Sequence, residues 1–206
     1  NYEKKILRRM GILKAGQAKL AIFASGKGSN AEKIIQYFVN HNNIHISLIV
    51  SNKSNAGVLD IAKRFGIETL LLEKKKFMES NDYVQYFKNQ GITHIVLAGF
   101  LLKIPDNLIQ TYNNKIVNIH PALLPAYGGK GMYGEHVHQA VIQAGEKETG
   151  ITIHLVDEEY DHGKTLFQAK VNVESNDTPG SLAEKVHRLE HEHYPAVIEK
   201  WVSRTS

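Results

Sequence analysis

Short apolar runs alternate with amphipathic segments along the first 118 residues of the chain. The runs that predict β-strands span residues 20–24, 44–51, 69–72, 94–98 and 115–118. Apolar positions at helical spacing between them predict helices at 30–41, 58–65, 82–90 and 106–112. Because strands that are apolar throughout must be covered on both faces, this alternation indicates a parallel sheet with helices on each side.

The pattern changes after residue 118. A stretch rich in Gly and Pro predicts a long loop, followed by a helix around residues 135–144. Two strand-like runs, 150–156 and 165–173, predict a hairpin added to the sheet. A final helix should begin after Thr178, a good capping residue with Pro179 at the first helical position. Pro195 should kink or divide that helix.

The chain shows no linker, repeat or low-complexity tract, so we expect one domain. The predicted fold class is α/β and Rossmann-like: a mostly parallel twisted sheet with helices on both faces and an added C-terminal β-hairpin. Residues 1–18 are basic, but they contain Glu3, lack Ser and are too polar for a secretory signal. We therefore expect residues 1–18 to be a short N-terminal extension and residues 19–206 to be the folded domain.

Composition narrows the classes of function. Of the 206 residues, 42% are hydrophobic, which is enough for a real core. Without Cys the chain forms neither disulfides nor thiolate metal sites, and we expect a reducing, cytoplasmic location. No apolar run approaches the roughly 18 residues of a membrane-spanning helix. The formal charge of +4 suits anionic small molecules but is too diffuse to predict nucleic-acid binding.

A glycine-rich loop joins the first predicted strand to the first predicted helix. Residues 26–31 match G-x-G-x-x-A, a form of the dinucleotide-binding motif. The second strand ends without the acidic residue that binds an NAD ribose, although Lys53 would suit the 2′-phosphate of NADP. A triphosphate P-loop is excluded because Gly28 follows Lys27. We favour phosphate binding over a plain turn in which Ser29 or Asn30 caps the helix.

Two histidine patterns resemble metal sites. His187 and His191 fit the H-x-x-E-H spacing of a zinc helix, and His136 and His138 form a second pair. Neither pair has a clear third ligand, so we expect no metal.

Two further segments carry candidate chemistry at strand ends. Asn118 and His120 in "NIHP" would place an amide and an imidazole on the same side of an extended segment. An amide can stabilise an oxyanion, and an imidazole can move a proton near neutral pH. The acidic loop "DEEYDHG", residues 157–163, could bring a carboxylate to His120 and raise its pKa. From the residues alone, a structural His and a solvated acidic turn remain open alternatives.

Together these segments resemble the folate-dependent formyltransferase family, from about residue 19 to near the C-terminus. The matching stretches are "SGKGSN", "VLAGF", "NIHPALLPAY", "GITIHLVDEEYDHG" and "LEHEHYP". The first and last of them point to the branch that acts on glycinamide ribonucleotide. The family's catalytic residues fall on Asn118, His120 and Asp161, with His154 as a supporting histidine. Its contacts to substrate phosphate and ribose fall on Gly26, Lys27, Gly28, Ser29, Asn30 and Glu190. Its folate contacts fall on Leu101, Leu102, Lys103, Ile104, Val156, Asp157, Glu158, Glu159 and Tyr160.

The resemblance implies a reaction without a metal. The amine of glycinamide ribonucleotide would attack the formyl carbon of 10-formyltetrahydrofolate directly, as a step in purine biosynthesis. Asn118 and a protonated His120 would stabilise the oxyanion, while Asp161 would keep His120 charged and pass a proton through water. Small-molecule substrates would be the partners, with no nucleic acid or membrane, and the protein would be a monomer or a weak homodimer.

The chain departs from the family pattern at three places: His162 stands where Gly is frequent, Lys103 where Arg is common, and residues 128–136 form an insertion. Methionyl-tRNA and sugar-nucleotide formyltransferases normally carry an extra C-terminal domain, for which we expect this chain to be too short. Formyltetrahydrofolate hydrolase usually has an N-terminal regulatory domain. An NADP-dependent oxidoreductase and a non-catalytic phosphate-binding module remain alternatives from other classes.

Overall fold

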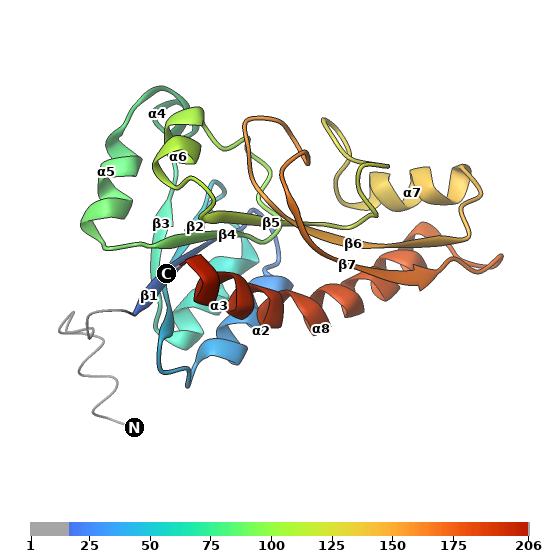
Figure 1. Ribbon diagram of the computed structural model, residues 1–206, viewed down its shortest axis with the longest axis horizontal. Coiled ribbons are helices and arrows are strands. Elements are labelled where there is room, and N and C mark those ends of the chain that lie inside the picture. The colour runs from blue at the N-terminus through green and yellow to red at the C-terminus, as the bar shows by residue number, and fades with distance from the viewer. Residues whose placement is uncertain (1–16, 206) are drawn as a thin grey trace.

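The computed structural model of the protein describes residues 17–205 (Figure 1). Most of the predicted N-terminal extension, residues 1–16, lies outside the described residues. Within the described range, seven strands form one sheet in the order β3-β2-β1-β4-β5-β6-β7. Their bounds are β1 (Ala18–Phe23), β2 (Ile44–Ser51), β3 (Glu68–Leu71), β4 (His94–Leu97), β5 (Ile116–His120), β6 (Glu148–Leu155) and β7 (Thr165–Asn172). The first five strands run parallel, whereas β6 is antiparallel to β5 and β7 to β6. The predicted fold class is therefore confirmed.

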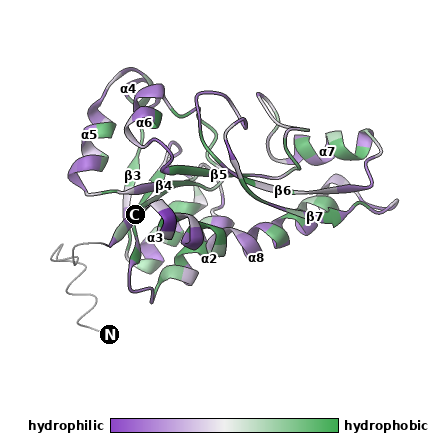
Figure 2. Ribbon diagram, in the orientation of Figure 1, coloured by the Kyte–Doolittle hydropathy of each residue, from purple (hydrophilic) through white to green (hydrophobic). Residues whose placement is uncertain are grey.

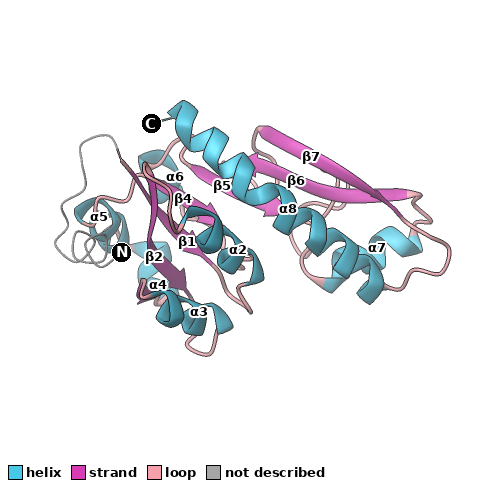
Figure 3. Cartoon of the chain, turned by 90° about the horizontal axis from the view of Figure 1, so that it is seen from below, coloured by secondary structure: helices cyan, strands magenta, loops and turns pink. Residues whose placement is uncertain are grey.

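Helices cover both faces of the sheet (Figures 1 and 3). One face carries α2 (Ser29–Phe38), α3 (Gly57–Phe65) and α8 (Pro179–Thr205), and the other carries α4 (Lys74–Glu79), α5 (Asp82–Asn89) and α6 (Asp106–Thr111). Successive side chains of β1 point to opposite faces of the sheet and so contribute to both layers. Leu20 and Ile22 join the core under α2 and α8, whereas Ala21 and Phe23 join the core under α5 and α6. In Figure 2 the hydrophobic colour concentrates in the central strands, and hydrophilic residues line the outer turns of the helices.

The remaining helix, α7 (Glu135–Gln143), packs against α8 beside the β6–β7 hairpin (Figure 3). Its two histidines, two residues apart, point to different faces of the helix. His138 is buried and His136 is exposed.

Helix α8 begins where it was expected, but Pro195 does not divide it as expected. Thr178 does cap α8, because its Oγ1 accepts a hydrogen bond from the amide of Ser181 at 3.1 Å. Pro195 does not divide the helix, which continues to Thr205. Tyr194, beside the proline, is fully buried, and its hydroxyl donates to the Leu97 carbonyl at 2.7 Å. Packing against the sheet thus outweighs the backbone hydrogen bond that proline removes.

Helix α2 is capped by Gly28, so the alternative of a plain turn in which Ser29 or Asn30 caps the helix does not hold. Gly28 has a φ of 83° and makes no side-chain capping bond. The side chains of Ser29 and Asn30 therefore stay free for other contacts at this end of the helix.

Candidate functional site

A cavity of about 930 Å³ lies at the carboxyl ends of β1, β4 and β5. Open α/β sheets bind their ligands at this edge, and ligand sites commonly measure about 300–1,000 Å³. Every predicted site residue lines this cavity except Glu158. Its neighbours Asp157 and Glu159 line the cavity and Glu158 does not, and its assignment to the folate contacts stays a prediction.

The glycine loop forms one end of the cavity. The chain must pass close to α3 here, since a Cβ added at Gly28 would lie 2.8 Å from the Cβ of Val58. The amide of Val58 also donates to the Gly26 carbonyl at 3.2 Å, which ties the loop to α3. The free amides at the start of α2 face the cavity, so this end can hold an anion.

Asn30 and Glu190 form a buried polar pair beside the loop. The Asn30 Nδ2 donates to the Glu190 Oε2 at 2.9 Å, and Glu190 is only 5% exposed. Burial raises the pKa of Glu190 above its usual range, although the bond from Asn30 opposes the shift. The Asn30 Oδ1 is buried and has no hydrogen-bond partner within residues 17–205. The pair is therefore equipped to exchange hydrogen bonds with hydroxyl groups of a ligand.

Asn118 and His120 lie on the same face of β5, two residues apart, and antiparallel pairing places His154 of β6 opposite Asn118. The His154 Nδ1 donates to the Leu155 carbonyl at 2.8 Å, so its Nε2 is left to accept. That Nε2 lies 3.2 Å from the Asn118 Nδ2. His154 thereby fixes which way the Asn118 amide points, and the second hydrogen of this amide remains available to a ligand.

Asp161 comes from the β6–β7 loop and reaches both histidines. Its Oδ2 lies 3.5 Å from the His120 Nδ1, and its Oδ1 lies 3.7 Å from the His154 Nε2. Burial alone would raise the pKa of Asp161. The two histidines and the Gly129 amide outweigh burial, so its pKa is lowered and the group is a carboxylate at neutral pH.

Each ring nitrogen of His120 faces a hydrogen-bond acceptor, because Nε2 lies 2.7 Å from the Tyr127 carbonyl oxygen and Nδ1 lies 3.5 Å from the Asp161 Oδ2. Burial lowers the pKa of this imidazole, whereas Asp161 and the Tyr127 carbonyl act in the opposite direction. The expectation that Asp161 keeps His120 charged stays a prediction.

The predicted folate segments form the other end of the cavity. Ser25 ties this end to the glycine loop, because its Oγ accepts a hydrogen bond from the Leu101 amide at 3.0 Å. In the acidic loop, the His162 Nδ1 lies 2.8 Å from the Asp157 Oδ2, and this bond raises the pKa of His162. His162, which replaces a frequent Gly, thus braces the loop that carries Asp161.

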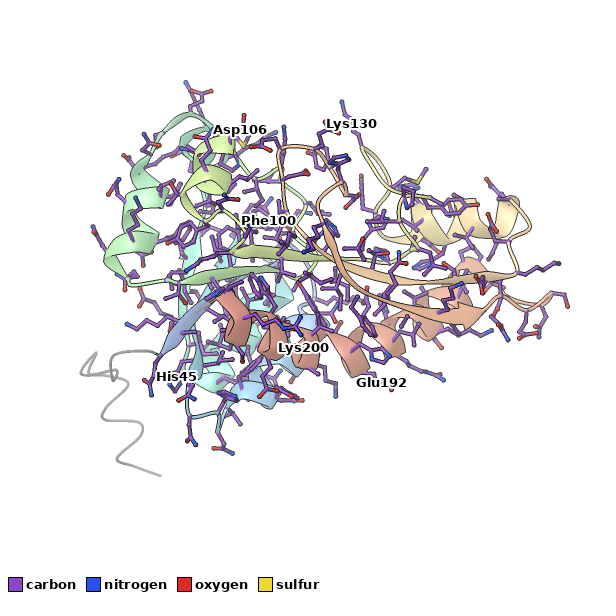
Figure 4. The ribbon with its side chains drawn as sticks, viewed as in Figure 1. His45, Phe100, Asp106, Lys130, Glu192 and Lys200 are labelled. Carbon is purple, nitrogen blue, oxygen red and sulfur yellow. The ribbon has the colours of Figure 1, made fainter. Side chains whose placement is uncertain are left out.

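The cavity is also lined by residues that the sequence analysis did not place in the site, among them Lys53, Phe100, Lys130, Met132, Tyr133, His138 and His187. Lys130 lies on the inserted loop at the upper edge of the molecule (Figure 4). Lys27, Lys53, Lys103 and Lys130 line the cavity, and within residues 17–205 none of them forms a salt bridge. Four unpaired cations around one cavity favour ligands with several negative charges.

Among residues 17–205 we find no group of three or more His, Asp or Glu side chains placed to bind a metal. His187 and His191 stack with ring centroids 6.4 Å apart, but Glu190 between them is bonded to Asn30. The described helices include none with the length and hydrophobicity needed to cross a membrane.

Comparison with known proteins places this site in a family. Residues 18–198 match the family described as formyl transferase. A chloroplastic phosphoribosylglycinamide formyltransferase of Arabidopsis thaliana is 43% identical over 87% of this chain, which spans 64% of the plant protein's length. The Bacillus subtilis phosphoribosylglycinamide formyltransferase is 37% identical, with 88% of this chain and 93% of the relative covered. A crystal structure of the Bacillus halodurans enzyme of that name superposes with a TM-score of 0.82 at 36% identity, covering 91% and 97% of the two chains. The chain therefore belongs to the formyl transferase family.

Proposed function

We propose that the protein transfers the formyl group of 10-formyltetrahydrofolate to the amine of glycinamide ribonucleotide, a reaction of purine biosynthesis. The observation that carries this proposal is one cavity joining an anion-binding helix start to the Asn118, His120 and Asp161 cluster. The names of the plant and Bacillus relatives support the same substrate. We assign the reaction to residues 19–206 and retain the predictions of a cytoplasmic, monomeric or weakly dimeric protein.

The ribonucleotide binds at the α2 end of the cavity. Its phosphate accepts hydrogen bonds from the loop of Gly26, Lys27, Gly28 and Ser29, and its ribose hydroxyls exchange hydrogen bonds with Asn30 and Glu190. The Glu190 Oε2 already accepts a hydrogen bond from Asn30, and the carboxyl group can accept another from a ribose hydroxyl. The folate lies against Leu101–Ile104 and the 156–160 loop, which places its formyl group beside β5.

The amine nitrogen then attacks the formyl carbon, and the carbonyl oxygen becomes an oxyanion. The free Nδ2 hydrogen of Asn118 points to this oxygen, and one such donor is commonly worth about 100-fold to 1,000-fold in rate. The positive charge of protonated His120, which Asp161 stabilises at 3.5 Å, lies beside this oxyanion, and Asp161 takes the proton that the amine releases through ordered water. The proton passes to the folate nitrogen as its bond to carbon breaks, which balances the reaction without a covalent enzyme intermediate.

An assay of tetrahydrofolate release tests the proposal. We expect release from 10-formyltetrahydrofolate when glycinamide ribonucleotide is present, together with formylated ribonucleotide detected by mass spectrometry. Release at the same rate without the ribonucleotide would instead show a hydrolase. Absence of release, combined with saturable quenching of protein fluorescence by NADPH, would favour the oxidoreductase alternative.

A further inference from the structure

His138 is a buried polar side chain on the wall of the cavity that the proposed reaction does not use. Only 2% of its surface is exposed, and it lines the cavity from α7. Its Nδ1 is buried, and neither ring nitrogen forms a hydrogen bond within residues 17–205. Buried polar groups are nearly always hydrogen-bonded, because an unpaired group loses its bonds to water and gains none in return. The His138 ring is therefore suited to a partner that enters the cavity as a ligand.

The fold places His138 between the ribose end of the cavity and the catalytic cluster. Helix α7 packs against α8, whose cavity-facing side carries Ala183, His187 and Glu190 at helical spacing (Figure 3). Burial lowers the pKa of His138 to about 4, and a positive charge on His187 of α8 or His120 of β5 lowers it further, so both rings lie near it. His138 thus lies on the wall between Glu190, the proposed ribose contact, and the reacting groups of β5.

The part of glycinamide ribonucleotide that spans this interval is its amide group, which joins the ribose to the carbon that carries the reacting amine. In the proposed site the phosphate has the glycine loop as its partner, and the ribose hydroxyls have Asn30 and Glu190. The amide, with one N–H and one carbonyl oxygen, has no partner among these residues. An imidazole can accept from the N–H or donate to the carbonyl oxygen, so the match holds whichever ring nitrogen of His138 carries the hydrogen.

We propose that His138 hydrogen-bonds the amide group of glycinamide ribonucleotide and so helps to bring the amine to Asn118 and His120. This inference rests on the proposed function, and it assigns a substrate contact to a residue of α7 that belongs neither to the catalytic cluster nor to the phosphate and ribose contacts. A histidine that only filled the core would support the fold, but it would not distinguish ligands that have the amide from ligands that lack it.

The first test compares glycinamide ribonucleotide with ribose 5-phosphate, which shares its phosphate and ribose but lacks the glycinamide group. His138→Leu removes the polar atoms of the ring and keeps an apolar side chain of similar volume in the buried position. We expect calorimetry to show a Kd for the ribonucleotide that rises about tenfold to a hundredfold, with the Kd for ribose 5-phosphate changing by less than about twofold. An unchanged Kd for the ribonucleotide, or an equal weakening of both ligands, would overturn the proposal.

His136→Leu is the matched control, because His136 lies two residues away on α7, is exposed and does not line the cavity. It should bind both ligands as the unmodified protein does. His138→Asn and His138→Gln are the conservative variants, since they return an amide near the positions of Nδ1 and Nε2 respectively. We expect one of them to recover part of the affinity for the ribonucleotide that His138→Leu loses. If both were as weak as His138→Leu, a hydrogen bond from this position would be contradicted.

A measurement on the unmodified protein separates this inference from the proposed function. In ¹⁵N-histidine-labelled protein, the ring resonances of His138, assigned by their absence in whichever conservative variant folds, should shift with glycinamide ribonucleotide and stay in place with ribose 5-phosphate. A shift with both ligands, or an unmoved ring in a protein that binds the ribonucleotide and transfers the formyl group, would refute the His138 contact alone.

The remaining outcomes concern the proposed function. A shifted ring in a protein that releases no tetrahydrofolate would refute the transfer reaction and leave the contact standing. A protein that does not bind the ribonucleotide at all would refute both.

Discussion

The two histidines of the cluster differ because their ring nitrogens have different partners. Both nitrogens of His154 are engaged, one with its own neighbour's carbonyl and one with Asn118. His120 faces the Tyr127 carbonyl with Nε2 and the Asp161 carboxylate with Nδ1. Two imidazoles on neighbouring strands therefore have separate roles: His154 orients an amide, and His120 pairs with a carboxylate.

Asp161→Asn tests this division of roles at the level of a single atom. The amide keeps the shape of the carboxylate but cannot stabilise a charged His120, so we expect kcat to fall by about 100-fold or more. The KM for the ribonucleotide should change little, since Asp161 lies away from the phosphate end. Steady-state kinetics measure both constants, and Glu174→Gln, the same chemical change at an exposed position, is the control. A kcat for Asp161→Asn equal to that of the control would remove Asp161 from the mechanism.

Part of this site could be predicted from the sequence and part could not. That Asn118 and His120 lie on the same face follows from the two-residue period of a strand. Only the family resemblance favoured a catalytic role for them over a structural one. Lys130 and Tyr133 were missed because they lie on an inserted loop, whose course depends on glycine conformations that no periodic pattern encodes. The lowered pKa of His120 depends on burial, which the sequence does not specify for a polar strand end.

Elements with a strong apolar pattern were predicted well. Strand β2 has its predicted limits, and the other strands differ by a few residues at either end. Helix α4 was missed because it is short and buries only Phe77, so three successive lysines conceal its period. The cap of α2 at Gly28 was not foreseen, because the steric demand there comes from Val58, which lies on another helix.

The start of α2 gives a prediction about stability. Gly28→Ala should lower the free energy of unfolding by about 1–3 kcal/mol, because the new Cβ overlaps Val58 and a positive φ is required. Gly26→Ala is the matched control for stability, since a Cβ there meets nothing within 4 Å. Urea unfolding of both variants measures the difference. Equal losses in the two variants would show that α3 does not constrain the loop.

At the scale of the whole molecule, the cavity collects residues that are far apart in the chain. The anion loop comes from residues 25–30, the reacting groups from β5 and the β6–β7 loop, and Glu190 from α8. Strand β6 runs antiparallel to β5, and this reversal lets the 156–161 loop, which follows β6, turn back over the edge of the sheet. If the next strand were parallel instead, the chain would need a crossover helix to reach it. Within residues 17–205, four lysines that form no salt bridge line this cavity, so positive charge gathers where an anionic ligand would bind.

Two buried histidines outside the proposed catalytic cluster should make the stability of the fold depend on pH. Burial lowers the pKa of both His94 and His138 to about 4, with a smaller effect of Lys115 on His94 and of nearby histidines on His138. His94 is held between the Thr93 and Thr205 hydroxyls and packs on Trp201, so it cannot easily escape to water when protonated. Above the unfolded pKa of about 6.5 both states are neutral and stability is at its maximum. As the pH falls from about 6.5 towards 4, the unfolded chain binds protons that the folded chain does not, and stability is lost at up to about 1.4 kcal/mol per pH unit for each group.

Urea unfolding at pH 7.5 and pH 5.0 measures this dependence, and we expect a clearly lower midpoint at pH 5.0. His94→Gln should unfold more easily at pH 7.5, because a buried contact is lost, but its midpoint should change less between the two pH values. His136→Gln is the matched control, since His136 is exposed on α7 and its replacement should leave the pH dependence unchanged. A midpoint for the unmodified protein that is equal at the two pH values, or higher at pH 5.0, would mean that these two rings take up protons in the folded state as readily as in the unfolded chain.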